Sequence, residues 1–186
     1  VAALSVFANQ GQTCASGSRI YVHRSILGSF LERLKERAGQ VVLGDPLDEA
    51  TQMGSLINER QLQRVMSYVA GALEEGATLI AGGKRPDRPG CFFEPTIFAG
   101  DNNLTVAREE IFGPVATVIA FDEDDEVLKY ANLNSYGLTA VLWTNDAARI
   151  TRFTRAIEAG VVWVNGWGPP HPALPWLGVK SSGLGE

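Results

Sequence analysis

Histidine and cysteine are scarce in this 186-residue sequence, which contains two of each. The two cysteines, Cys14 and Cys91, cannot form a disulfide framework, and neither lies in a cysteine–histidine cluster with the spacing of a zinc site. Neither His23 nor His171 is close to Cys14 in sequence, so a surface or packing role is the expectation for both. We therefore expect no metal site and a reduced, cytoplasmic setting.

Long apolar runs and an excess of positive charge are missing as well. No segment approaches the roughly 20 apolar residues that span a bilayer, and residues 1–7 lack the basic leader and cleavage pattern of a signal peptide. The formal net charge of −5 gives nucleic acid or an anionic membrane no electrostatic reason to bind. With 45% hydrophobic and 20% charged residues, the composition is that of a globular domain, and we expect neither partner.

Helical and strand patterns alternate along almost the whole chain. We expect helices at residues 25–38, 58–75, 123–134 and 146–159. We expect strands at residues 19–22, 79–81, 92–98, 115–121, 138–144 and 161–164. Strands separated by helices of about 10 to 15 residues are typical of an α/β domain. The pattern therefore predicts an α/β fold with a largely parallel sheet flanked by helices.

Local signals refine these elements. Asn58 and Asp146 are the expected N-caps of their helices, and Gly160 is expected in the left-handed conformation that ends a helix. Pro95 argues against a central place in the sheet for its strand. The acidic cluster at residues 122–126 is explained by the helix dipole without a metal. One stripe of the second helix is expected to be buried: Leu62, Val65, Met66, Val69 and Leu73.

The segment around Cys14 is the most informative part of the sequence. Small and polar residues surround the cysteine just before a strand, which would place the thiol beside free backbone N–H groups. Such dipoles favour the reactive thiolate and stabilise an oxyanion next to it. The alternative is that Cys14 is a small buried hydrophobic residue, and local context leaves both interpretations open.

Five segments together resemble one family. Residues 7–19 have the pattern F-x-N-Q-G-Q-x-C-x-x-G-S-R, which is similar to the active-site cysteine signature of the aldehyde dehydrogenase superfamily. Four further segments follow in the family's order and resemble its motifs: R-E-E-I-F-G-P-V at 108–115, N-S-Y-G-L at 134–138, G-V-V-W-V-N at 160–165 and G-V-K-S-S-G at 178–183. The similarity covers nearly the whole chain and implies the catalytic-domain fold of that family.

The resemblance implies roles for particular residues. Cys14 matches the nucleophile that forms a thiohemiacetal with the aldehyde, and after hydride transfer to NAD or NADP a thioester remains for water to cleave. Glu110 matches the glutamate that binds the nicotinamide ribose, and Phe112 matches the aromatic residue packed near the nicotinamide. Without the F-G-P that follows, a solvated acidic pair would be the better interpretation of residues 109–110. Asn9 is expected to be a structural hydrogen-bonding residue.

The substrate pocket is predicted from residues that lie next to the cysteine in sequence or in the loop after Asn165. Apolar and aromatic walls would suit a small aldehyde with an apolar tail. Phe7 could equally belong to the core, and the Trp-Leu-Gly at 176–178 departs from the family's commoner aromatic-Gly-Gly. The loop at 166–175 is expected to be a packed binding loop. The predicted pocket residues are Phe7, Thr13, Ala15, Trp167 and Trp176.

The resemblance also defines what residues 1–186 do not carry. There is no G-x-G-x-x-G or P-loop, and neither the family's general-base glutamate motif nor its oxyanion-hole asparagine occurs here. Glu186 stands where the family has Arg or Lys. We therefore expect one catalytic (cysteine) domain over 1–186, truncated at both ends, with the cofactor-binding domain absent and little activity on its own.

Three functional hypotheses remain at this point. The first is an aldehyde dehydrogenase acting as a homo-oligomer on a small aldehyde with NAD or NADP. The second is a weak thiol esterase that uses Cys14. The third is a truncated, non-enzymatic paralogue that binds another protein, and an isolated domain of this kind would self-associate through uncovered apolar surface.

Overall fold

The computed structural model describes residues 1–168 and 172–184, so His171 and Glu186 lie outside the described residues. The chain forms two compact units, Ala2–Phe121 and Asp122–Glu186, the second of which includes Val1. Each unit is described by itself. Within the described residues, no helix is long and apolar enough to cross a membrane.

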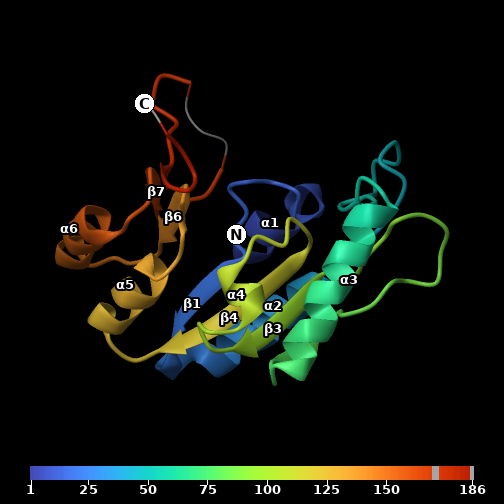
Figure 1. The fold of residues 1–186 in the computed structure, drawn as a ribbon, viewed down its shortest axis with the longest axis horizontal. Helices are drawn as coiled ribbons and strands as arrows, with labels where there is room; N and C mark the ends of the chain where they lie inside the picture. The colour runs from blue at the N-terminus through green and yellow to red at the C-terminus, as the bar shows by residue number, and fades with distance from the viewer. Residues whose placement is uncertain (169–171, 185–186) are drawn as a thin grey trace. The chain divides into compact units, whose positions relative to one another are not determined.

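The first unit is built on a four-stranded sheet with the strand order β1-β4-β3-β2 (Figure 1). Strand β4 runs parallel to both of its neighbours, β1 and β3, while β2 pairs antiparallel at the edge. The predicted α/β fold with a largely parallel sheet is therefore confirmed. The strands are β1 (Arg19–His23), β2 (Thr78–Ala81), β3 (Thr96–Gly100) and β4 (Val115–Phe121).

Two hydrophobic clusters cover the two faces of this sheet, because successive side chains of a strand point to opposite faces. On β4, Val115 and Ile119 join the cluster that contains helix α3 (Glu59–Glu74). Ala116 and Val118 join the cluster that contains helix α2 (Leu27–Gly39) and helix α1 (Ala2–Phe7). The remaining helical segments are η1 (Ala8–Gly11), η2 (Arg24–Ile26) and α4 (Thr105–Arg108).

The second unit contains shorter elements. Strands β6 (Thr139–Leu142) and β7 (Val161–Val164) pair in parallel, and β5 (Tyr136–Gly137) pairs antiparallel with β8 (Val179–Lys180). Helices α5 (Asp124–Asn132) and α6 (Ala147–Ala156) are linked by an ion pair of 2.8 Å between Arg149 Nε and Asp124 Oδ2.

Both predicted helix caps are confirmed. The Asn58 side chain accepts a hydrogen bond from the Gln61 N–H at 2.9 Å, and the Asp146 carboxylate accepts from the N–H groups of Ala148 and Arg149. These bonds satisfy N–H groups that have no partner within the helix, and they fix where α3 and α6 begin. The backbone N–H bonds lower the pKa of Asp146.

The buried stripe of α3 differs from the prediction at two positions. Leu62, Val65 and Val69 are buried, but Met66 is 36% exposed and Leu73 is 48% exposed. Ala72 is fully buried in their place. Only a narrow stripe of α3 packs on the sheet. The small Ala72 side chain fits within this stripe, whereas the larger side chains of Met66 and Leu73 lie at its margins.

Two backbone predictions are also wrong. Gly160 has no positive φ; α6 has already ended at Ala156, and glycine is needed because a Cβ there would lie 1.8 Å from the Leu177 carbonyl oxygen. Pro95 does not keep its segment away from the centre of the sheet. Strand β3 begins immediately after Pro95, so the missing N–H costs no ladder bond and β3 is an interior strand.

Candidate active site

The loop that leads to Cys14 has an unusual backbone. Asn9, Gln10 and Gly11 have φ values of 51°, 59° and 67°, three left-handed residues in succession. Non-glycine residues in this region are strained, and such strain is concentrated at functional sites. The Asn9 side chain holds the turn together, because its Nδ2 donates to the Gln12 carbonyl at 2.9 Å while the Gln12 N–H donates to the Asn9 carbonyl at 3.0 Å.

Cys14 lies in a tight turn fastened to helix α1. The Ser16 N–H donates to the Thr13 carbonyl at 2.9 Å, and the Ser16 hydroxyl donates to the Ser5 carbonyl at 3.1 Å. Ala15 is buried beneath the turn, whereas Cys14 is exposed and has a free thiol. The interpretation of Cys14 as a buried hydrophobic residue is therefore wrong.

A second loop, at residues 109–113, is held by side chains of α3. Gln61 Nε2 donates to the carbonyl oxygens of Ile111 at 3.0 Å and Phe112 at 2.8 Å. Arg64 Nη2 donates to the Glu110 carbonyl at 2.7 Å. Phe112 has a φ of 58° and is 40% exposed, so these bonds fix a strained residue whose ring faces solvent.

The two adjacent glutamates of this loop have different surroundings. The Tyr68 hydroxyl donates to the Glu109 carboxylate at 2.7 Å, and the Arg64 guanidinium lies 4.9 Å from the centre of the Tyr68 ring. The exposed Glu110 carboxylate has no hydrogen bond or ion pair with any residue that the structure describes. Glu109 therefore anchors the loop, and Glu110 is the carboxylate available to a ligand.

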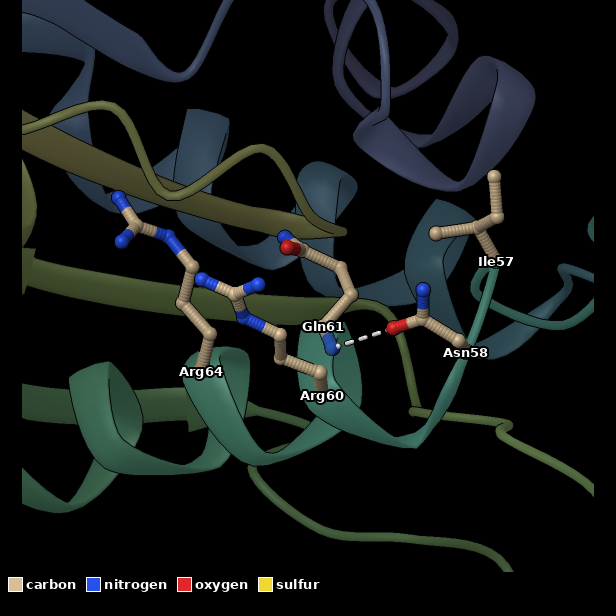
Figure 2. Close-up of a pocket in the computed structure, with 5 residues that line it drawn as sticks. All are labelled: Ile57, Asn58, Arg60, Gln61 and Arg64. Carbon is tan, nitrogen blue, oxygen red and sulfur yellow. Dashed lines mark hydrogen bonds between the residues drawn. The ribbon is translucent and has the colours of Figure 1, made fainter.

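A polar groove of about 460 Å³ lies along the first turns of α3 (Figure 2). Figure 2 shows the side chains of Arg60, Gln61 and Arg64 projecting from the same side of the helix, with Ile57 and the capping Asn58 at its start. Two guanidinium groups and the positive end of the helix dipole make this groove suited to an anion. The prediction from sequence missed these residues, although polar side chains three and four positions apart after an N-cap were a usable signal.

The cysteine loop and the Glu110 loop are in direct contact. A Cβ on Gly11 would lie 2.0 Å from the Gly113 carbonyl oxygen, so the two backbones approach as closely as glycine allows. The Gln12 side-chain oxygen also accepts from the Ile57 N–H at 3.1 Å. Within the first unit, the loop that leads to Cys14 therefore packs against the loop that carries Glu110 and is bonded to the residue before the N-cap of α3.

Comparisons with known proteins show the family of the chain. The sequence profile of the aldehyde dehydrogenase family matches residues 1–186. The chain belongs to the aldehyde dehydrogenase family. It is 44% identical to a betaine aldehyde dehydrogenase of Brucella anthropi and 42% identical to one of Cereibacter sphaeroides, each aligned over the whole chain.

Solved structures of the family have the same fold. An NAD+ complex of a Bacillus cereus aldehyde dehydrogenase has a TM-score of 0.96 at 38% identity, over 99% of this chain and 38% of that one. An NAD-dependent aldehyde dehydrogenase of Sinorhizobium meliloti also scores 0.96, at 40% identity, over 99% of this chain and 37% of that one. The chain spans 39% of the Brucella protein and 38% of the Cereibacter protein.

The backbone strain coincides with the family motifs. Among the described residues, every non-glycine residue with positive φ lies in one of four motif segments: Asn9 and Gln10, Phe112, Asn165, and Lys180. In the second unit, Asn165 exchanges two side-chain bonds with the Thr144 backbone, and Lys180 Nζ donates to the carbonyl oxygens of Asn132 and Asn134. Four of the five motif segments therefore contain an unfavourable backbone conformation beside side chains that hold it in place.

The predicted substrate-pocket residues are divided between the two units. Phe7 is 3% exposed within a core cluster, and Thr13 and Ala15 flank the cysteine. In the second unit, Trp176 is 39% exposed and its ring lies 6.0 Å from that of Trp163, while Trp167 is partly buried. Their assembly into one pocket stays a prediction. No three His, Cys, Asp or Glu side chains of the described residues are grouped so that they could hold a metal ion.

Proposed function

We propose that this chain supplies the nucleophile of an enzyme that oxidises an aldehyde to a carboxylic acid with NAD or NADP. The Cys14 thiolate adds to the aldehyde carbon to give a thiohemiacetal, which loses a hydride to become a thioester, and water then releases the acid. The observation that carries the proposal is the contact of Gly11, in the loop that leads to the exposed Cys14, with Gly113, in the loop that presents an unpaired Glu110 carboxylate.

The residues of the site fit a dinucleotide cofactor. Glu110 can accept hydrogen bonds from ribose hydroxyls, and the exposed ring of Phe112 gives a nicotinamide an apolar surface. Arg60 and Arg64 line a groove suited to phosphate oxygens. A bound nicotinamide would accept the hydride. The NAD+ bound by the Bacillus cereus relative supports the same chemistry for this family.

The remaining parts of the reaction are proposed to come from outside this chain. The general base, the oxyanion-hole amide and most of the cofactor-binding surface belong to the larger protein, since the relatives are more than twice as long as this chain. Trp167 and Trp176 are proposed as aromatic walls of the aldehyde pocket. Betaine aldehyde, the substrate in the relatives' names, has a cationic end that such rings can bind. We propose a homo-oligomer for the parent protein.

The first test is Cys14→Ser in the protein of natural length, with Cys91→Ser as the matched control. Cys14→Ser should lower NADH formation by about a thousandfold or more, because an alcohol is a much weaker nucleophile than a thiolate. The thermal midpoint should be unchanged, since Cys14 is exposed. Aldehyde oxidation that survives in Cys14→Ser would contradict the proposal. Hydrolysis of an activated ester without NADH formation would instead favour a thiol esterase.

A second test compares the neighbouring glutamates. Glu110→Gln should lower kcat/KM for the cofactor about tenfold to a hundredfold, the loss expected for a hydrogen bond to a charged group. Glu109→Gln should leave the carboxylate at position 110 in place and change this value much less. A larger effect at position 109 than at 110 would show that the assignment of the cofactor glutamate is wrong.

A further inference from the structure

Gln12 connects the cysteine loop to the start of helix α3. Its side-chain oxygen accepts from the Ile57 N–H at 3.1 Å, across 45 residues of sequence. Ile57 comes directly before the N-cap Asn58, and Gln12 comes two residues before Cys14. The bond therefore joins the segment that carries the thiol to the segment that begins the basic groove.

The same helical turn holds the loop of Glu110. Asn58 accepts from the Gln61 N–H, and Gln61 in turn donates to the carbonyls of Ile111 and Phe112. The start of α3 is thus a shared support. Gln12 accepts from the residue just before its N-cap, and Gln61 in its first turn holds the Glu110 loop.

The other ties of the cysteine loop lead to other parts of the fold. The Ser16 hydroxyl and the Gly17 N–H donate to the Ser5 carbonyl of α1, so they do not join the loop to α3. The contact of Gly11 with the Gly113 carbonyl is one of close packing, which sets how near the backbones come but forms no directed bond. Gln10, in the amide orientation that satisfies both neighbours, accepts from the Gly54 N–H and donates to the Asn9 carbonyl at 3.0 Å each. Of the residues Gln10, Gly11 and Gln12, Gln12 is the nearest to Cys14 in sequence, and it forms a hydrogen bond with the segment before α3.

We propose that Gln12 is a positioning residue, which holds the Cys14 turn in register with the first turn of α3 and so sets where the thiol meets the aldehyde. The part of this proposal that concerns the reaction rests on the proposed function. The part that concerns the placement of the thiol does not. Small displacements of a reacting group cost large factors in rate even when substrate affinity is kept.

The experiment uses the protein of natural length and three variants of one position: Gln12→Leu, which removes the acceptor, Gln12→Glu, which keeps an acceptor oxygen, and Gln12→Ala as a second removal. The matched control is Gln52→Leu. Gln52 makes the same kind of bond elsewhere, because its side-chain oxygen accepts from the Val42 N–H at 3.0 Å. Equal thermal midpoints for Gln12→Leu and Gln52→Leu show that the fold is kept.

Two readouts separate the outcomes. The ratio of iodoacetamide alkylation at Cys14 to that at Cys91, measured on peptides by mass spectrometry, should shift about threefold or more in Gln12→Leu and Gln12→Ala. The alkylation ratio should equal the wild-type value both in Gln12→Glu and in the control Gln52→Leu. In aldehyde oxidation, Gln12→Leu should lower kcat about tenfold with KM for the aldehyde within about twofold, since only placement is lost.

An unchanged alkylation ratio in Gln12→Leu and Gln12→Ala would overturn the proposal, as would a shifted ratio that Gln12→Glu fails to restore. A shift that is restored by Gln12→Glu, in a protein that oxidises no aldehyde, would keep Gln12 as the residue that places the thiol and would reject the proposed dehydrogenase function.

Discussion

Gly11 occupies the point where the cysteine loop comes closest to the loop that carries Glu110. It has a φ of 67°, and a side chain there would meet the Gly113 carbonyl oxygen at 2.0 Å and the Gly113 carbonyl carbon at 2.4 Å. Both the conformation and the space therefore require glycine. The contact atoms belong to the backbone, so no rotation of a side chain can relieve the overlap.

Replacing Gly11 by alanine is expected to destabilise the first unit by about 3 kcal/mol, the sum of an unfavourable φ and a backbone clash. The measurement is the urea midpoint, followed by circular dichroism. Gly71→Ala in α3 is the matched control, because nothing lies within 4 Å of its added carbon. That change should stabilise the protein by up to about 1 kcal/mol, as alanine is the better helix former. Equal midpoints for the two variants would refute the proposed contact.

Single residues of the site differ in how far the sequence reveals them. Cys14, Glu110 and Phe112 stand in motifs that can be recognised along the chain. Gln61 and Arg64 could not be assigned in this way, because their contacts with the Glu110 loop span 46 to 51 positions and exist only after α3 has packed on the sheet. The role of Glu109 could not be assigned for the same reason, because the Tyr68 hydroxyl that binds its carboxylate is 41 residues away.

At the scale of elements, local sequence signals predicted where helices begin better than where they end or what they pack against. Helices α3 and α6 begin where Asn58 and Asp146 indicate, because a cap acts within its own turn. Helix α1 was not predicted. It is six residues long with an apolar sequence, and its stability comes from packing of Val6 and Phe7 in the core. The place of β3 inside the sheet was likewise set by pairing with β4.

Helix α4 is held against the end of α3 by Glu75. The Glu75 carboxylate accepts from the Thr105 hydroxyl at 2.5 Å and from the Thr105 N–H at 2.7 Å, and these two bonds lower its pKa from the ordinary value of 4.5. A carboxylate whose pKa falls on folding contributes stability above its unfolded pKa and loses it as the pH falls through the folded value.

The stability difference between wild type and Glu75→Gln should therefore be largest near neutral pH and shrink as the pH is lowered below the ordinary carboxyl pKa of 4.5 and through the depressed pKa of the folded state. Urea unfolding at a series of pH values measures it. Glu74→Gln is the matched control, since the neighbouring exposed carboxylate has no such partner among the described residues. A difference between wild type and Glu75→Gln that grows on acidification would contradict the anchoring of α4 by this carboxylate.

At the scale of the whole molecule, buried apolar side chains are distributed unevenly. Both core clusters lie within residues 2–121, where β3 and β4 are interior strands with most of their residues buried. Among the described residues of the second unit, the buried hydrophobic side chains are Val127 and Leu128. Strands β6 and β7 pair in parallel yet have no fully buried residue, although parallel strands are normally covered on both faces.

Local opening is easiest where few apolar contacts must be broken, so the two units should differ in hydrogen exchange. Amides of β3 and β4 should exchange slowest, and those of β6 and β7 at least about tenfold faster, as peptide-resolved mass spectrometry can measure. Slow exchange in β6 and β7 at every protein concentration would show that their two-stranded ladder is stable by itself, against this expectation. Protection that appears only as the concentration rises would mean that association between copies covers these strands.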